Sequence, residues 1–174
     1  MRISFVLAFV PMILAAGCGG SPGDASVSGT INGKSFSNAS SISSNTAGQT
    51  SAVIIISNVS DLCARVVSND EPTNVQALTF SLVEVNDANE VSAPAHTGDY
   101  ALLSESTKSG QFFSAGYDAI GATTSDTTDE NATDGTVTLT SFADDKYAGT
   151  FDLFFGTDHV TGTFDPTACA GIKP

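Results

Sequence analysis

Three cysteines are the residues of this 174-residue chain with the most definite chemistry. Cys18 follows an apolar leader, whereas Cys63 and Cys169 lie far apart in the rest of the chain. An exported protein usually pairs its cysteines, so an odd number requires a separate role for one of them. If Cys18 has that role, Cys63 and Cys169 remain to form a disulfide across about a hundred residues. Their spacing makes a zinc site or a redox Cys-x-x-Cys pair the weaker alternatives.

The histidines are the next candidates, because a Ser–His–Asp hydrolase needs one as its base. His159 follows Asp158 at the expected end of a hairpin, and His96 is the only other histidine. The chain has no Gly-x-Ser-x-Gly turn to supply a nucleophile. We therefore interpret both histidines as exposed polar residues and predict no catalytic residue.

Carboxylates could carry out glycoside hydrolysis or bind calcium. The pairs Asp144/Asp145 and Asp152/Asp165 are candidates for hydrolysis, but the second pair alternates with apolar residues, which indicates the outer face of strands. Between residues 122 and 134 a Thr/Asp-rich loop is expected, and its spacing is not that of an EF-hand. We favour a solvated acidic loop and predict no metal site or cofactor. The weak calcium candidates in this loop are Asp126, Asp129, Glu130 and Asp134, with Asn131 beside them.

The charge of the chain restricts its partners. With 19 acidic and 6 basic residues the formal net charge is −13, and removal of Arg2 would make it one unit more negative. Such a domain is repelled by nucleic-acid phosphates and by anionic lipid surfaces. We interpret the acidity as a contribution to solubility, with binding of a cation or a basic ligand as the alternative.

Residues 1–17 have the features of a signal peptide: Arg2, an apolar run of about 14 residues and a cluster of small residues. The run is shorter than the ~20 residues of a spanning helix. The cluster Ala15-Ala16-Gly17-Cys18 resembles a bacterial lipobox, although that family prefers Leu at the place of Ala15. The resemblance implies cleavage before Cys18, a diacylglyceryl thioether on its sulfur, and acyl chains such as palmitate in the bilayer.

Two alternatives remain for export. Ala15 and Gly17 also satisfy an ordinary secretory cleavage site, which would release the protein. Cysteine parity favours the lipoprotein, because free secretion would leave Cys18 as a stray thiol. By the sorting rule of Gram-negative lipoproteins, Gly19 after Cys18 indicates the outer rather than the inner membrane. Residues 18–26 have the composition of a flexible tether, and a single domain is expected over residues 27–174.

The domain is predicted to be all-β, because Thr, Ser, Val and Phe are frequent and most good helix formers are scarce. Asn32-Gly33 predicts a hairpin turn, residues 37–50 are a frayed strand or a loop, and residues 61–67 are a helical turn or a strand. Further strands are expected at residues 51–57, 74–85, 98–103 and 110–120.

The C-terminal third repeats one pattern: Gly135-Thr-Val, Gly149-Thr-Phe-Asp and Gly162-Thr-Phe-Asp, at offsets of 14 and 13 residues. Three antiparallel strands in a meander explain this spacing, with each glycine at a bulge or a close backbone approach. Together with the lipobox, the pattern resembles a group of uncharacterised all-β lipoproteins of Gram-negative bacteria. That resemblance implies a fold and a location but no activity.

These observations predict one antiparallel β-sandwich or flattened β-barrel of about 8–10 strands. The expected function is that of an exported, lipid-anchored protein with a non-enzymatic interaction or structural role at the cell envelope. Its partners would be the bilayer, through acylated Cys18, and an unknown protein or small ligand. The alternative is a barrel that binds a small ligand or Ca²⁺. Core packing is the favoured role of four aromatic residues that could otherwise form a binding face: Tyr100, Phe112, Phe113 and Tyr117.

Overall fold

The computed structural model describes residues 23–36, 40–44, 50–69, 72–103, 109–143 and 146–169. Cys18, the leader and the pair Asp144/Asp145 lie outside these residues. In chain order the elements are β1 (Gly23–Gly29), β2 (Ser40–Ser44), β3 (Ala52–Ser57), α1 (Leu62–Ser68), β4 (Val75–Val85), β5 (Val91–Ser92), β6 (Gly98–Leu102), β7 (Gly110–Ile120), β8 (Thr127–Asn131), β9 (Asp134–Ala143), β10 (Lys146–Phe155), β11 (Asp158–Asp165) and β12 (Thr167–Ala168).

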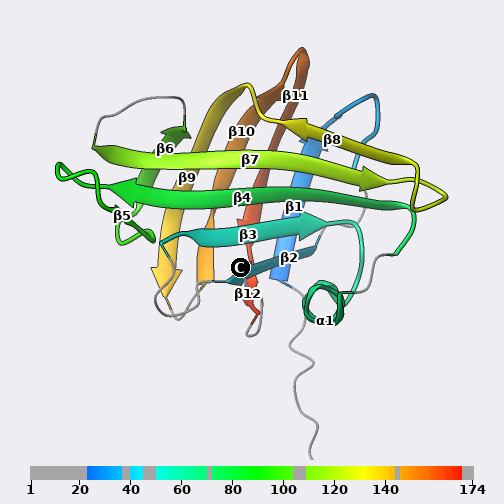
Figure 1. Cartoon of the computed structure of the whole chain (residues 1–174), viewed down its shortest axis with the longest axis horizontal. Helices are drawn as coiled ribbons and strands as arrows, with labels where there is room; N and C mark the ends of the chain where they lie inside the picture. Colours follow the sequence, from blue (N-terminus) through cyan, green and yellow to red (C-terminus); the bar gives the residue numbers. More distant parts are fainter. Residues whose placement is uncertain are drawn as a thin grey trace, which may run out of the picture.

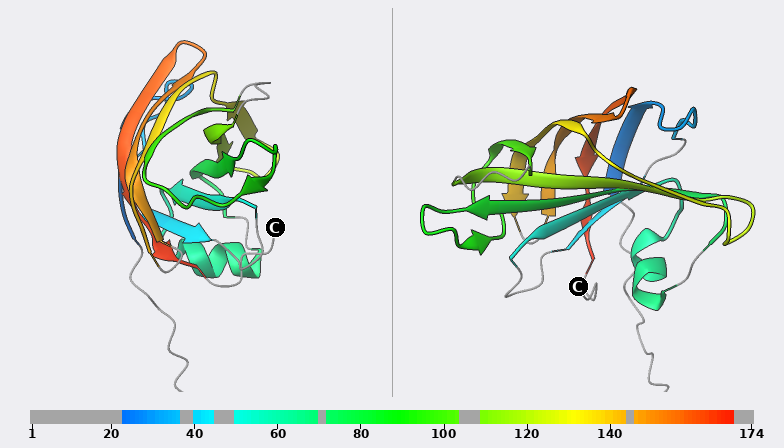
Figure 2. Two further views of the ribbon diagram at one scale, coloured as in Figure 1. Left: turned by 90° about the vertical axis from the view of Figure 1, so that its left-hand side faces the viewer. Right: turned by 45° about the horizontal axis from the view of Figure 1, so that its top comes forward.

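The strands form one sheet that curls into a closed ring. The ring runs β4–β3–β2–β1–β11–β10–β9–β6–β7, and the long pairing of β7 with β4 closes it. Figure 1 shows β3, β4 and β7 crossing in front of β1, β9, β10 and β11, and Figure 2 shows the curved wall that the second group makes. The structure is therefore a flattened barrel whose two walls pack face to face as in a sandwich, and the all-β prediction is confirmed.

The sheet differs from the prediction in strand number and in direction. It has twelve strands among the described residues, of which β5 and β12 have only two residues each. The pairings of β6 with β7 and of β12 with β2 are parallel. Parallel partners need a crossover rather than a hairpin, and a crossover leaves no turn motif by which the sequence could reveal it.

The glycine repeat is explained by the register of β10 and β11. Gly149 pairs with Phe164 and Phe151 pairs with Gly162, so each phenylalanine ring lies over the glycine opposite. The two Gly-Thr-Phe segments are thus antiparallel images of each other about the pair Thr150–Thr163. A register shift between Ala148 and Gly149 marks the bulge. The predicted meander of β9, β10 and β11 is confirmed.

Other short-range predictions have mixed outcomes. Asn32 and Gly33 have positive φ values of 53° and 68°, as a hairpin turn requires. Residues 40–44, in the segment expected to be a frayed strand or a loop, form strand β2. Helix α1 forms where a helical turn or a strand was expected. Two predictions were wrong: β1 already begins at Gly23, inside the expected tether, and β8 occupies the middle of the expected acidic loop. In both segments hydrogen bonding to a neighbouring strand, Asp24 opposite Asp165 and Asp129 opposite Asp118, outweighs a polar composition.

Aromatic side chains fill the space between the two walls. Phe80 of β4 packs against Phe151 and Phe164 of the opposite wall, with ring centroids 5.2 and 5.8 Å apart. Tyr117 of β7 makes an edge contact with Phe155 of β10 at 6.4 Å. All five rings are almost wholly inaccessible to solvent. The middle of the barrel is therefore a packed core.

Candidate functional site

The disulfide is a structural element at one end of the barrel. Cys63 in α1 is bonded to Cys169, which follows β12, with Cα atoms 5.6 Å apart. The Cys169 amide donates to the carbonyl of Ser43 on β2, and Ile42 and Leu62 pack beside the bond. The predicted pairing of these two cysteines is thus present in the structure, and it joins α1 to the residue that follows β12, which is itself hydrogen-bonded to β2. Cys18 lies outside the described residues.

The four calcium candidates do not converge on one point. Asp129 lies opposite Asp118 on β7, and burial together with the charge of Asp129 raises the pKa of Asp118. Asp134 lies at the start of β9, where its carboxylate accepts from the Gly135 amide at 2.7 Å. Within the described part of the chain, no three His, Cys, Asp or Glu side chains group as metal ligands. Asp129 and Glu130 are successive residues of β8, so their side chains point to opposite faces of the sheet. Asp126 precedes β8, and Asp134 is the first residue of β9.

The carboxylates of Asp152 and Asp165 also lie apart. Both are exposed on their strands, but Asp152 pairs with Thr161, four residues from Asp165 on β11. Four residues of a strand span about 13 Å. A glycosidase pair needs roughly 5–9.5 Å. The four aromatic residues proposed as a possible binding face, Tyr100, Phe112, Phe113 and Tyr117, are buried in the core.

His96 belongs to a polar cluster that holds a loop. The Glu84 carboxylate accepts from the amides of Ala95 and His96, the Tyr100 hydroxyl and the His96 Nδ1, each at 2.9 Å. Burial would raise the pKa of Glu84, but these hydrogen bonds outweigh it and lower the pKa from 4.5 to about 2. Burial, and then Glu84 itself, raise the pKa of Tyr100 far above its usual range. Both oxygens of the Glu84 carboxylate accept hydrogen bonds. We call this cluster the Glu84 clamp, and it fixes the loop between β5 and β6 to β4.

His159 contacts a different aspartate from its neighbour in sequence. Its Nε2 lies 2.8 Å from Oδ1 of Asp152 on β10, and its ring stacks on Phe154 with centroids 4.4 Å apart. Asp158 instead accepts from the Asn32 amide at 2.7 Å. The side chains of Asp152 and His159 are 59% and 47% exposed, so the pair lies on the outer surface. Sequence reasoning missed this pair because the hairpin register alone brings the two strands' side chains together.

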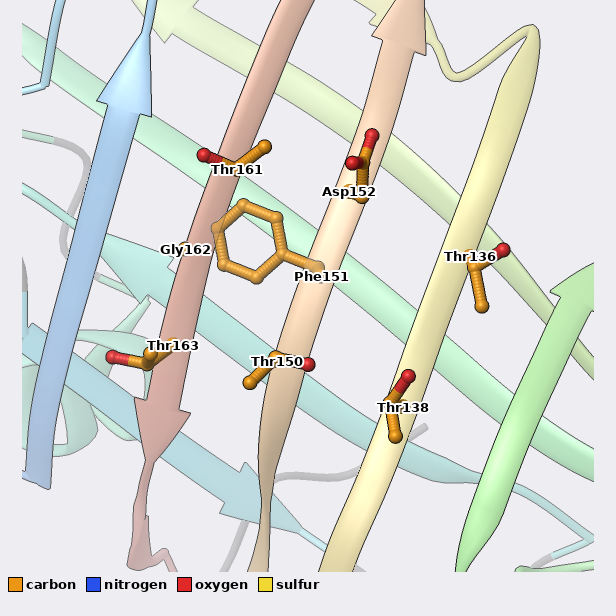
Figure 3. A pocket seen from close by; sticks show the side chains of 8 residues that line it. All are labelled: Thr136, Thr138, Thr150, Phe151, Asp152, Thr161, Gly162 and Thr163. Carbon is orange, nitrogen blue, oxygen red and sulfur yellow. The ribbon is translucent and has the colours of Figure 1, made fainter.

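A groove lined mainly by threonine side chains lies beside this pair, on the outer face of β9, β10 and β11. Figure 3 shows it, and its volume is about 440 Å³. Phe151 and Gly162 also line the groove. Cross-strand pairing places its polar side chains in two rows, Thr138–Thr150–Thr163 and Thr136–Asp152–Thr161.

Each of the three strands contributes one side chain held by the protein and one that is free. Thr138 donates to Asp99 at 2.7 Å, Thr163 bonds Ser26 at 2.8 Å, and Asp152 is held by His159. The other three hydroxyls have no protein partner within the described part of the chain. They belong to Thr136, Thr150 and Thr161. Held groups keep a surface in one arrangement, and free groups leave hydrogen bonds for a ligand.

The groove could have been found from the sequence by a period-two pattern. Thr136 and Thr138, and Thr161 and Thr163, each form a Thr-x-Thr step, and such residues share one face of a strand. The sequence analysis placed Asp152 on the outer face of its strand, but it did not recognise the threonines of this face as a set. Their alignment across strands depends on the register, which the sequence does not state.

Comparison with known proteins gives no relative: no protein-family model, curated protein or solved structure matches the chain. No helix among the described residues has both the length and the apolar character needed to span a membrane. The function must therefore be argued from the groove and from the N-terminal sequence.

Proposed function

We propose that this protein is a lipid-anchored, non-enzymatic binding protein of the bacterial cell envelope, with the groove on β9, β10 and β11 as its ligand site. The observation that carries the proposal is the alternation, along the two rows, of polar side chains held by the protein with free hydroxyls. The alternative of a ligand inside the barrel has less support, because Phe80, Phe151 and Phe164 occupy the middle.

The N-terminal sequence supports an anchor close to the domain. Cys18 precedes Gly23, the first residue of β1, by five residues. Five residues span at most about 17 Å. A lipid on Cys18 would therefore keep the barrel within that distance of the bilayer, where it meets envelope components. Outer-membrane placement, indicated by Gly19, is part of the proposal.

Anchoring is tested by comparing the full chain with Cys18→Ser in a Gram-negative host. We expect the unsubstituted chain in the membrane fraction, with an intact mass that shows the added diacylglyceryl group and the loss of two hydrogens for the disulfide. The Cys18→Ser protein should be soluble in the periplasm. Membrane retention of Cys18→Ser, or an unacylated mass for the original chain, would refute the anchor.

Ligand binding is tested by co-sedimentation of purified Cys18→Ser protein with isolated envelope fragments. Thr150→Val removes one free hydroxyl and preserves the β-branched shape, and Asp152→Asn removes the charge of the one acidic side chain among the described residues that line the groove. Each lost hydrogen bond should weaken binding about twofold to tenfold. The matched control is Thr127→Val on β8, which should bind as the parent does. Equal binding by all four proteins would contradict the proposal.

A further inference from the structure

The geometry points to a neutral glycan as the ligand of this groove, an inference that rests on the proposed function and names its ligand class. The groove offers hydroxyl groups in two parallel rows, one carboxylate and an aromatic pair at its border. A sugar chain presents the complementary groups: hydroxyls at its edges and C–H surfaces on its faces.

The negative charge of the groove and of the whole chain favours a neutral ligand over an anionic one. Among the described residues, Asp152 is the only charged one that lines the groove, and Asp99 is bonded to Thr138 at its border. The whole chain has a formal net charge of −13. Anionic polysaccharides and nucleic acids would meet repulsion without a compensating cation. A divalent metal ion would find a single carboxylate to balance its charge, because the other oxygens of the groove belong to neutral hydroxyls. A neutral polyol incurs neither cost.

The threonine side chain suits a sugar because it has two kinds of contact. Its hydroxyl both donates and accepts, so it can match either role of a sugar hydroxyl. Its methyl group gives an apolar contact for a C–H. Neighbouring strands place the members of each row about 4.8 Å apart. That repeat is close to the length of one pyranose unit, so a glycan lying across the strands would meet a polar side chain of each row at successive units.

The stacked rings of Phe154 and His159 extend the site beyond the second row. Phe154 is 38% exposed although it is apolar, and His159 links it to Asp152 through the 2.8 Å hydrogen bond. An exposed aromatic surface beside fixed polar groups is the usual composition of a specific small-ligand site. We assign to this pair the apolar contact with a sugar at the border of the groove and to Asp152 the contact with two of its hydroxyls.

Isothermal titration of the Cys18→Ser protein with a defined panel tests the assignment. The neutral probes are maltohexaose, cellohexaose, laminarihexaose and mannohexaose, and the anionic comparison is hexagalacturonate. We expect at least one neutral hexasaccharide to bind with a measurable Kd and hexagalacturonate not to bind. Thr150→Val, Asp152→Asn and Phe154→Ala should each raise that Kd at least threefold, and Thr127→Val should leave it unchanged.

The outcomes distinguish an error in the ligand class from an error in the location of the site. If no neutral hexasaccharide binds, or hexagalacturonate binds more tightly, while co-sedimentation with envelopes still depends on Thr150 and Asp152, the glycan assignment is overturned and the proposed function stands. If a hexasaccharide binds equally to the parent and all groove variants, the groove is not the site, and the proposed function falls with the assignment. Circular dichroism of each variant confirms that the comparison is made between folded proteins.

Discussion

The substitution Glu84→Gln should destabilise the protein at neutral pH but not at pH 2. In the folded protein the hydrogen bonds of the clamp lower the pKa of Glu84 from 4.5 to about 2. Each pKa unit corresponds to about 1.4 kcal/mol, so the carboxylate contributes at most about 3.5 kcal/mol. The Glu84 side chain is 14% exposed, and we reduce the expected contribution to about 2 kcal/mol for solvent screening.

The direction of the pH dependence follows from the sign of the shift. A carboxyl group with a lowered pKa stabilises the fold above its unfolded pKa of about 4.5, and that contribution disappears as the pH falls toward 2. Urea unfolding at pH 7, 5, 4, 3 and 2 measures the free-energy difference between the parent and Glu84→Gln. We expect about 2 kcal/mol at pH 7 and 5 and a steady decrease below that. A difference near zero at pH 7, or one that persists unchanged at pH 2, would refute the clamp.

The remaining predictions concern the disulfide and the glycine pairs. Replacing both Cys63 and Cys169 by Ala opens a loop that spans 106 residues and should lower the free energy of unfolding in urea by about 4 kcal/mol. Reduction of the parent protein should have the same effect. A loss below about 1 kcal/mol would contradict the structural role of the bond. Gly162→Ala should cost about 2–3 kcal/mol, because the new methyl group would overlap the Ser26 carbonyl and the Phe151 ring. Its control, Gly116→Ala, meets its nearest atoms at 3.8 Å and should change stability little; equal effects of the two substitutions would show that the close approach at Gly162 is not limiting.

The sequence predicted the parts of the fold that depend on local patterns. Asn32-Gly33 specified a turn because few residue pairs accept two positive φ values. The glycine repeats specified a meander because Gly149 and Gly162 leave room for the rings of Phe164 and Phe151. The alternation in residues 74–85 likewise matched β4, whose Leu78, Phe80 and Leu82 are buried.

The parts that the sequence did not predict depend on distant partners. β8 has the composition Thr-Thr-Asp-Glu-Asn and forms only because it pairs with β7. The closure of the ring through β4 and β7, and the parallel pairing of β6 with β7, join segments whose patterns do not name their neighbours. The candidate site has the same origin, since Asp152 meets His159 and the two threonine rows align only through the register of three strands.

The central claim, that a ligand lies across β9, β10 and β11, is tested most directly by NMR. Amide chemical shifts of the ¹⁵N-labelled Cys18→Ser protein would be followed during titration with the tightest-binding neutral hexasaccharide. We expect the largest changes at residues 136–138, 150–154 and 159–163, with β3 and β4 on the opposite wall unaffected. Changes centred on β3, β4 or β7, or no changes at saturating sugar, would contradict it.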